Sequence, residues 1–141
     1  MGTVESITGN CLCGAVQYSC DADLDHAHAC HCHMCQRAGG ISLSVKCVSP
    51  LKFEGEDNLT VYKSSEWGER LFCGKCGSSI AWRMQDGSLE FVSTGTINTN
   101  PEIKLASQLY VDHKPAHYNF AEETDMLTSA DMAALYAEAG K

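Results

Sequence analysis

Three thiols and two imidazoles stand within six residues in the stretch Cys30-His31-Cys32-His33-Met34-Cys35. An apolar interior would leave most of their donors and lone pairs unpaired, so packing alone does not account for this cluster. Thiolate and imidazole are ligands that zinc prefers, and a C-x-C run followed by C-x-x-C lets one turn present three sulfurs to one ion. The stretch therefore predicts a zinc site with Cys30, Cys32 and Cys35 as ligands and a fourth position open.

A histidine closing this site is the alternative. His28, His31 and His33 are near enough in the chain to supply a fourth ligand, which would make the site structural. Alternate side chains of an extended backbone face opposite sides, so we expect His31 to point away from an ion held by its two neighbours. His33 lies on a turn between ligands, and its direction stays open.

Four further cysteines form two pairs that are far apart in the chain, Cys11 with Cys13 and Cys73 with Cys76. Glycine follows a cysteine in both pairs, and its positive φ lets backbone amides turn toward the sulfurs. The two pairs are either incidental or ligands of one ion, and their spacing favours a filled four-sulfur structural zinc site. Such a site stabilises a fold by on the order of 10 kcal/mol and does no chemistry. The remaining cysteines, Cys20 and Cys47, end alternating strands and are expected to be buried as small apolar side chains.

Composition limits the partners and the compartment. The chain has 141 residues, 44% of them hydrophobic, and a net charge of −8 with no basic patch, which argues against nucleic acid and anionic membranes as partners. No basic and then apolar leader and no membrane-length apolar run is present, so we expect a cytoplasmic protein. Reducing conditions there make nine cysteines more natural as metal ligands than as disulfides.

Short strands must position these residues. Alternation of apolar and polar residues predicts strands, and Asp-Gly at 86–87 predicts the turn of a hairpin. The acidic stretch 21–25 is predicted to be a turn, and a helix is predicted from Ser129, with Ser129 as its cap. We therefore expect one mostly-β domain over residues 1–141, made of short antiparallel strands with a short C-terminal helix. The predicted strands are 15–20, 27–30, 41–47, 51–53, 59–63, 79–84, 88–93 and 105–111.

Three motifs together resemble the glutathione-dependent formaldehyde-activating enzyme / centromere protein V family. They are the stretches 9–18, 30–37 and 72–80, each of which contains one cysteine group. The resemblance implies a zinc-binding β-tent fold with two zinc ions per chain. It also implies that Cys11, Cys13, Cys73 and Cys76 hold a structural zinc, whereas Cys30, Cys32 and Cys35 hold a catalytic one. The family's namesake joins glutathione to formaldehyde as an S-hydroxymethyl adduct.

We therefore expect a carbon–sulfur lyase similar to an S-(hydroxymethyl)glutathione synthase, which captures a thiol such as glutathione and adds it to formaldehyde or another small carbonyl. Zinc acidifies an incoming thiol and keeps its sulfur nucleophilic. Arg37, two residues past the last ligand, either pairs with a substrate carboxylate or is simply solvated. The alternatives are a zinc-stabilised binding module in which both metal sites are structural, and a thiol redox protein that uses Cys32 and Cys35.

Overall fold

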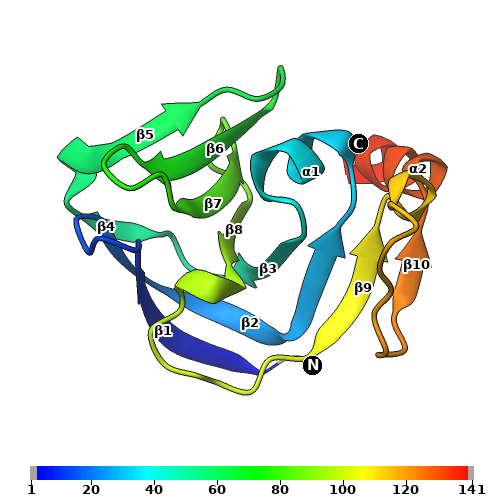
Figure 1. Ribbon diagram of the computed structural model, residues 1–141, viewed down its shortest axis with the longest axis horizontal. Helices are drawn as coiled ribbons and strands as arrows, with labels where there is room; N and C mark the ends of the chain where they lie inside the picture. Colours follow the sequence, from blue (N-terminus) through cyan, green and yellow to red (C-terminus); the bar gives the residue numbers. More distant parts are fainter. Residues whose placement is uncertain (1–2, 140–141) are drawn as a thin grey trace.

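The computed structural model describes residues 3–139. Its strands join in one sheet, in the order β10-β9-β2-β3-β8-β7-β6-β5, with β1 and β4 also paired to β2 (Figure 1). The strands are β1 (Val4–Asn10), β2 (Gln17–Cys30), β3 (Ser42–Cys47), β4 (Lys52–Glu54), β5 (Leu59–Tyr62), β6 (Gly68–Cys73), β7 (Ser79–Met84), β8 (Glu90–Ser93), β9 (Leu105–Leu109) and β10 (Asp125–Leu127). The helices are α1 (His33–Gly39) and α2 (Ser129–Ala139), and short 3₁₀ turns are η1 (Glu56–Asn58), η2 (Thr94–Thr96) and η3 (Val111–His113). The prediction of a mostly-β fold with a short C-terminal helix is confirmed.

Strand β2 is the spine of the sheet, because it pairs with β1, β3, β4 and β9. Along β2, Tyr18, Cys20, Ala22 and Leu24 are buried and the residues between them are more exposed. The register against β3 shifts between Asp23 and His28, and the buried positions then change to Ala27 and Ala29. A shift of this kind turns the following side chains to the other face of the strand.

The acidic stretch 21–25 is not a turn, and this prediction was wrong. Asp21, Asp23 and Asp25 occupy every second position of β2 and alternate with buried residues. Charges at every second position form the solvent-facing side of a strand, so a continuous strand accommodates them. Asp21 accepts a hydrogen bond from the Ser6 hydroxyl at 2.6 Å, and Asp25 accepts one from the Thr3 amide at 2.9 Å. These bonds attach β1, which the sequence patterns did not reveal.

Most strand pairs are antiparallel, as expected, but two pairs are parallel and the sheet is therefore mixed. Strand β9 runs parallel to β2, and β10 runs parallel to β9. Figure 1 shows β9 (yellow) beside the C-terminal half of β2 (blue), with α1 (cyan) above them and the hairpin strands β5–β7 (green) standing apart. Parallel pairing requires a long return through space, and local sequence patterns do not encode that return. The hairpin of β7 and β8 is confirmed.

The hydrophobic core lies between β2 and β3 on one side and β6 to β8 on the other. Leu24, Leu71, Ile80, Val45 and Val92 are fully buried there. Two cysteines predicted as ligands belong to the same cluster, Cys11 and Cys73. The first cysteine group is therefore built into the core.

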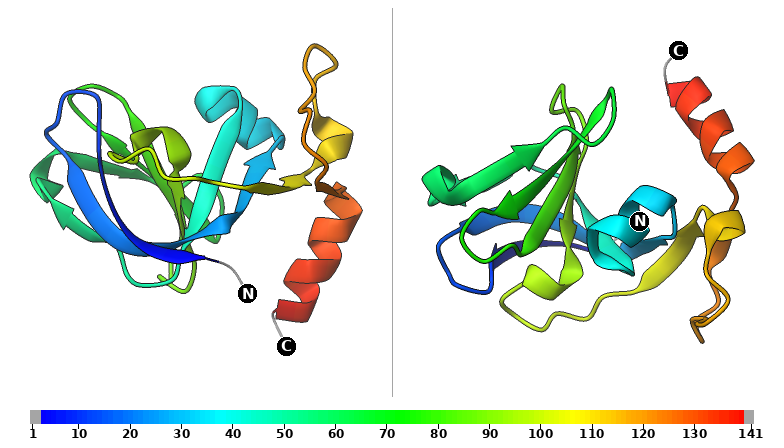
Figure 2. Two further views of the ribbon diagram at one scale, coloured as in Figure 1. Left: turned by 90° about the horizontal axis from the view of Figure 1, so that it is seen from below. Right: turned by 45° about the horizontal axis from the view of Figure 1, so that its top comes forward.

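Helix α2 stands at the edge of the molecule, beyond β9 and η3 (Figure 2). Its cap is Thr128, not Ser129. The Thr128 hydroxyl accepts from the amide of Asp131 at 3.2 Å, and the Asp131 carboxylate accepts from the amide of Thr128 at 2.9 Å, which is a reciprocal capping box. Neither helix of residues 3–139 has the length and apolarity to cross a membrane.

Replacing Leu71 by alanine tests the placement of the core. Leu71 is fully buried on β6, so its truncation removes apolar contacts and leaves a cavity. We expect the L71A variant to lose about 2–5 kcal/mol of unfolding free energy in urea denaturation of the metal-loaded protein. Leu135→Ala is the matched control, since that side chain is 52% exposed. Its effect should stay within about 0.5 kcal/mol. Equal losses in both variants would contradict this core.

Candidate metal centres and their surroundings

The four cysteines at 11, 13, 73 and 76 meet in space. Cys11 and Cys13 lie in the turn after β1, whereas Cys73 ends β6 and Cys76 lies in the turn that follows. Their sulfurs all lie within 4.8 Å of one another, with 3.6 Å between Cys11 and Cys13 and 3.7 Å between Cys13 and Cys73. Sulfurs that share a tetrahedral zinc with bonds of about 2.3 Å are about 3.8 Å apart. The observed spacing therefore fits a four-sulfur metal centre.

Backbone and side-chain donors surround these sulfurs. The amide of Val16 donates to the Cys11 sulfur at 3.3 Å, and the amide of Lys75 donates to the Cys73 sulfur at 3.4 Å. The Ser78 hydroxyl lies 3.2 Å from the Cys76 sulfur. This hydroxyl, together with the Ser78 amide, lowers the pKa of the Cys76 thiol to about 5. Such bonds disperse negative charge and favour the thiolate form that a metal requires.

The second group consists of Cys30, Cys32 and Cys35, whose sulfurs also lie within 4.8 Å of one another. Cys30 is the last residue of β2 and Cys32 is the N-cap of α1. The Cys32 sulfur accepts a hydrogen bond from the amide of Cys35 at 3.3 Å, so the helix start fixes the two sulfurs relative to each other. A strand end and a capped helix thus present three sulfur donors to one point.

No imidazole belongs to this group among the described residues, although three were candidates. His31 is fully buried, and its Nδ1 lies 2.6 Å from the Tyr118 hydroxyl, with its Nε2 2.9 Å from Oε1 of Gln108. The expectation that it points elsewhere is confirmed. The Nε2 of His28 lies 3.0 Å from the Ser44 hydroxyl, and His33 stacks on His113 with 4.4 Å between ring centroids. The residues present therefore form a three-sulfur donor set.

An arginine that the sequence reasoning missed contacts this group. Nη2 of Arg70 donates to the Cys35 sulfur at 3.6 Å. Hydrogen bonds from Cys30 and Cys32 lower the pKa of Cys35, and the Arg70 guanidinium lowers this pKa further. Arg70 comes from β6, three residues before Cys73, and shares a strand face with Phe72. No local motif marks Arg70, because the contact depends on how β6 packs near α1.

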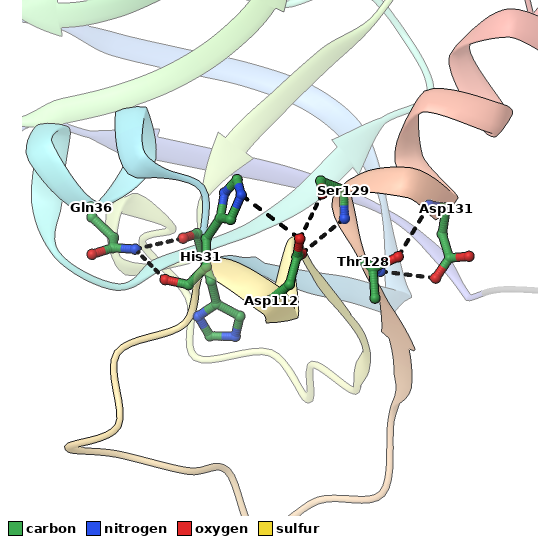
Figure 3. Close-up of polar contacts among 7 residues, drawn as sticks. His31, Gln36, Asp112, Thr128, Ser129 and Asp131 are labelled. Carbon is green, nitrogen blue, oxygen red and sulfur yellow. Dashed lines mark hydrogen bonds and ion pairs between the residues drawn. The ribbon is translucent and has the colours of Figure 1, made fainter.

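Helix α1 is held in place by Gln36. Its side-chain amide donates to the carbonyl oxygens of His31 at 2.7 Å and His113 at 2.9 Å (Figure 3). Asp112 of η3 in turn accepts from the amide and hydroxyl of Ser129 at 2.9 and 2.6 Å. Figure 3 shows this chain of contacts running from α1 through η3 to α2. The position of the cysteine turn is therefore coupled to the C-terminal part of the protein.

Two cavities lie beside α1, and the smaller one borders the three-sulfur group. The larger, of about 560 Å³, lies between α1 and the strands β5 to β7 and is lined by Arg37, Arg70, Met34, Phe72 and Ser64, among others. The smaller, of about 340 Å³, is lined by Cys35 and Arg70 together with hydroxyl side chains. Arg37, which the sequence analysis offered as a substrate-binding residue, is exposed and lines the larger cavity. These volumes are in the range of small-molecule sites.

The two remaining cysteines and the histidines at 113 and 117 lie outside both groups. Cys20 and Cys47 are buried with their sulfurs 3.6 Å apart, so the expectation of small buried side chains is confirmed. His117 is exposed. His113 stacks on His33 and is half-buried.

The fold and the two cysteine groups define a mostly-β protein with two centres able to hold metal ions. Comparison with known families matches residues 6–113 to the glutathione-dependent formaldehyde-activating enzyme family, and the chain belongs to this family. The resemblance seen in the three motifs is thereby confirmed. The matched region ends at η3, so β10 and α2 lie beyond it.

Two known proteins are similar to this chain. A Schizosaccharomyces pombe protein described as an uncharacterized lyase is 28% identical over 122 residues, which cover 85% of this chain and 89% of that protein. A crystal structure of a Rhodobacter sphaeroides protein superposes with a TM-score of 0.56 at 26% identity, covering 67% of this chain and 92% of the other.

Replacing Cys73 by serine tests the four-sulfur centre. We expect the C73S variant to lose one metal ion per chain, measured by plasma mass spectrometry. Loss of that ion should lower the unfolding midpoint by at least about 10 °C, since structural metal binding contributes directly to folding. Cys47→Ala is the control, because Cys47 is buried but belongs to neither group. A C73S protein with unchanged metal content would refute the centre.

Proposed function

We propose that this protein is a zinc-dependent carbon–sulfur lyase-type enzyme that joins a thiol, glutathione or a similar molecule, to formaldehyde or another small carbonyl. The observation that carries the proposal is the three-sulfur group at Cys30, Cys32 and Cys35, which contains no imidazole among residues 3–139 and borders a cavity. Membership of the family and the lyase name of the S. pombe relative support it. We propose a single catalytic domain over residues 1–141.

Two zinc ions per chain are part of the proposal. Cys11, Cys13, Cys73 and Cys76 would hold a structural ion, and Cys30, Cys32 and Cys35 would hold a catalytic one. The catalytic ion would supply acidification of the substrate thiol, so that the thiolate is available at neutral pH. None of the nine cysteines, all of which lie within residues 3–139, forms a disulfide, and this suits the reducing compartment that we propose, the cytoplasm.

The larger cavity suits the body of an acidic thiol. Arg37 is exposed on its wall, and a guanidinium can pair with a carboxylate through two parallel hydrogen bonds. The Ser64 hydroxyl on the same wall is buried and has no hydrogen-bond partner among the described residues, so a polar group of a ligand would satisfy it. Met34 and Phe72 supply apolar contacts. We therefore assign Arg37 to the substrate carboxylate.

Replacing Cys32 by serine tests the reaction. Adduct formation from glutathione and formaldehyde also proceeds without protein, so the uncatalysed rate must be subtracted. We expect the C32S variant to retain one zinc ion and to lose the catalysed rate, whereas Cys47→Ala keeps both. Full activity of C32S without its second zinc would contradict the proposal. X-ray absorption that finds a fixed nitrogen on the second ion would favour a binding module instead.

Replacing Arg37 by glutamine tests substrate binding. The loss of one charged pair is expected to raise KM for glutathione by about 10-fold, with little change in kcat. KM for 2-mercaptoethanol, which lacks a carboxylate, should change by less than about twofold. Equal increases for both thiols would show that Arg37 does not bind a carboxylate.

A further inference from the structure

Arg70 lies at the junction of the two cavities. It lines both of them, together with Ala38 and Ser79. The larger cavity contains Arg37 but no cysteine of the three-sulfur group, whereas the smaller one contains Cys35. A ligand that extends from the larger cavity into the smaller one would therefore lie beside Arg70.

This guanidinium forms no ion pair with a carboxylate of residues 3–139. Its neighbour Glu69 faces the other side of β6 and pairs with Nε of Arg83 at 2.7 Å. Within the same range of the chain, the only hydrogen bond of the Arg70 side chain is the one from Nη2 to the Cys35 sulfur. A guanidinium has five N–H donors, so most of those of Arg70 remain available to a ligand.

The proposed reaction creates a negative charge next to this position. A thiolate sulfur attacks the carbonyl carbon, a C–S bond forms, and the π electron pair of the C=O bond moves to oxygen. The resulting alkoxide takes one proton from water. The thiol released one proton to water when it became a thiolate, so the protons balance and the net reaction is RSH + R′CHO → RS–CH(OH)R′. The three neighbouring cysteine sulfurs would be thiolates when they hold a metal ion, so a developing alkoxide beside them needs a cationic donor.

We propose that Arg70 is the oxyanion donor of this site, with one N–H held by Cys35 and others aimed at the carbonyl oxygen. This inference rests on the proposed function and assigns a separate role to each of two arginines. Arg37 binds the carboxylate of the thiol in the larger cavity, and Arg70 stabilises the addition step. The carbonyl compound enters the smaller cavity, where Ser79, Ser93 and Thr94 provide hydroxyl groups.

Kinetics of Arg70→Gln and Arg70→Lys form the first test. Removing one oxyanion donor typically slows a reaction by at least about 100-fold, so we expect kcat of R70Q to fall by about that factor while KM for the thiol changes by less than about threefold. R70K keeps the charge and should recover about 10-fold of the loss. Lys46→Gln is the charge-matched control, because Lys46 is exposed on β3 and lines neither cavity. Zinc content is measured for every variant.

Binding of two small ligands to the zinc-loaded protein gives a readout that does not depend on turnover. Thioacetate carries a sulfur, a carbon and an oxygen in the same order as the alkoxide, and its oxygen shares the negative charge with the sulfur, whereas ethanethiol has no oxygen. Measured by calorimetry, the R70Q substitution should weaken the binding of thioacetate by at least about 30-fold and the binding of ethanethiol by less than about threefold. R70K should lie between R70Q and the wild-type protein for thioacetate.

Three outcomes would overturn the inference. The first is a kcat of R70Q within about threefold of wild type. The second is an R70Q variant in which the binding of thioacetate and the binding of ethanethiol are weakened equally. The third is loss of the second zinc ion from R70Q, which would make Arg70 a structural partner of Cys35. A wild-type protein that neither binds ethanethiol nor shows a catalysed rate would instead refute the proposed function, and Arg70 would have no reaction to serve.

Discussion

The convergence of four cysteine sulfurs from two distant turns is the constraint on which the rest of this protein depends. Cys11 and Cys13 come from one turn and Cys73 and Cys76 from the other, and all four sulfurs lie within 4.8 Å of one another. Thiolates so close together repel, and burying them is costly unless a cation lies between them. Cys11 and Cys73 also belong to the hydrophobic core, so the core and the metal centre form one unit. The four-sulfur centre therefore joins the turn after β1 to the end of β6.

Strand β2 connects this unit to the three-sulfur group. Its first half supplies the core with Tyr18, Cys20, Ala22 and Leu24, and its last residue is Cys30. The register shift between Asp23 and His28 changes which face of the strand is buried. The residues just before Cys30 therefore have the opposite alternation of buried and exposed side chains from the first half of the strand. Helix α1 then begins at once, capped by the Cys32 sulfur. The central strand of the sheet thus ends directly at the turn that carries the three-sulfur group.

The chain is acidic, with a net charge of −8, but a positively charged side chain lies beside the three-sulfur group. Glu69 and Arg70 are adjacent on β6 and face opposite sides, and Arg83 neutralises Glu69 on its own side. Arg70 is therefore left to the sulfur of Cys35, where a carboxylate would add to the negative charge of three thiolates. The alternation of a strand places a cation beside the site and an anion away from it.

Local chemistry determined the ligand groups, the strand character and the C-terminal helix, because cysteine spacing and residue alternation are properties of short stretches. The continuous strand through Asp21–Asp25, the parallel pairing of β9 and the contact between Arg70 and Cys35 were decided only in three dimensions. Each of these brings together residues far apart in the chain or depends on the partner that a strand finds. The sequence by itself therefore determined which atoms could bind a metal, and the tertiary structure decided which charges and cavities surround them.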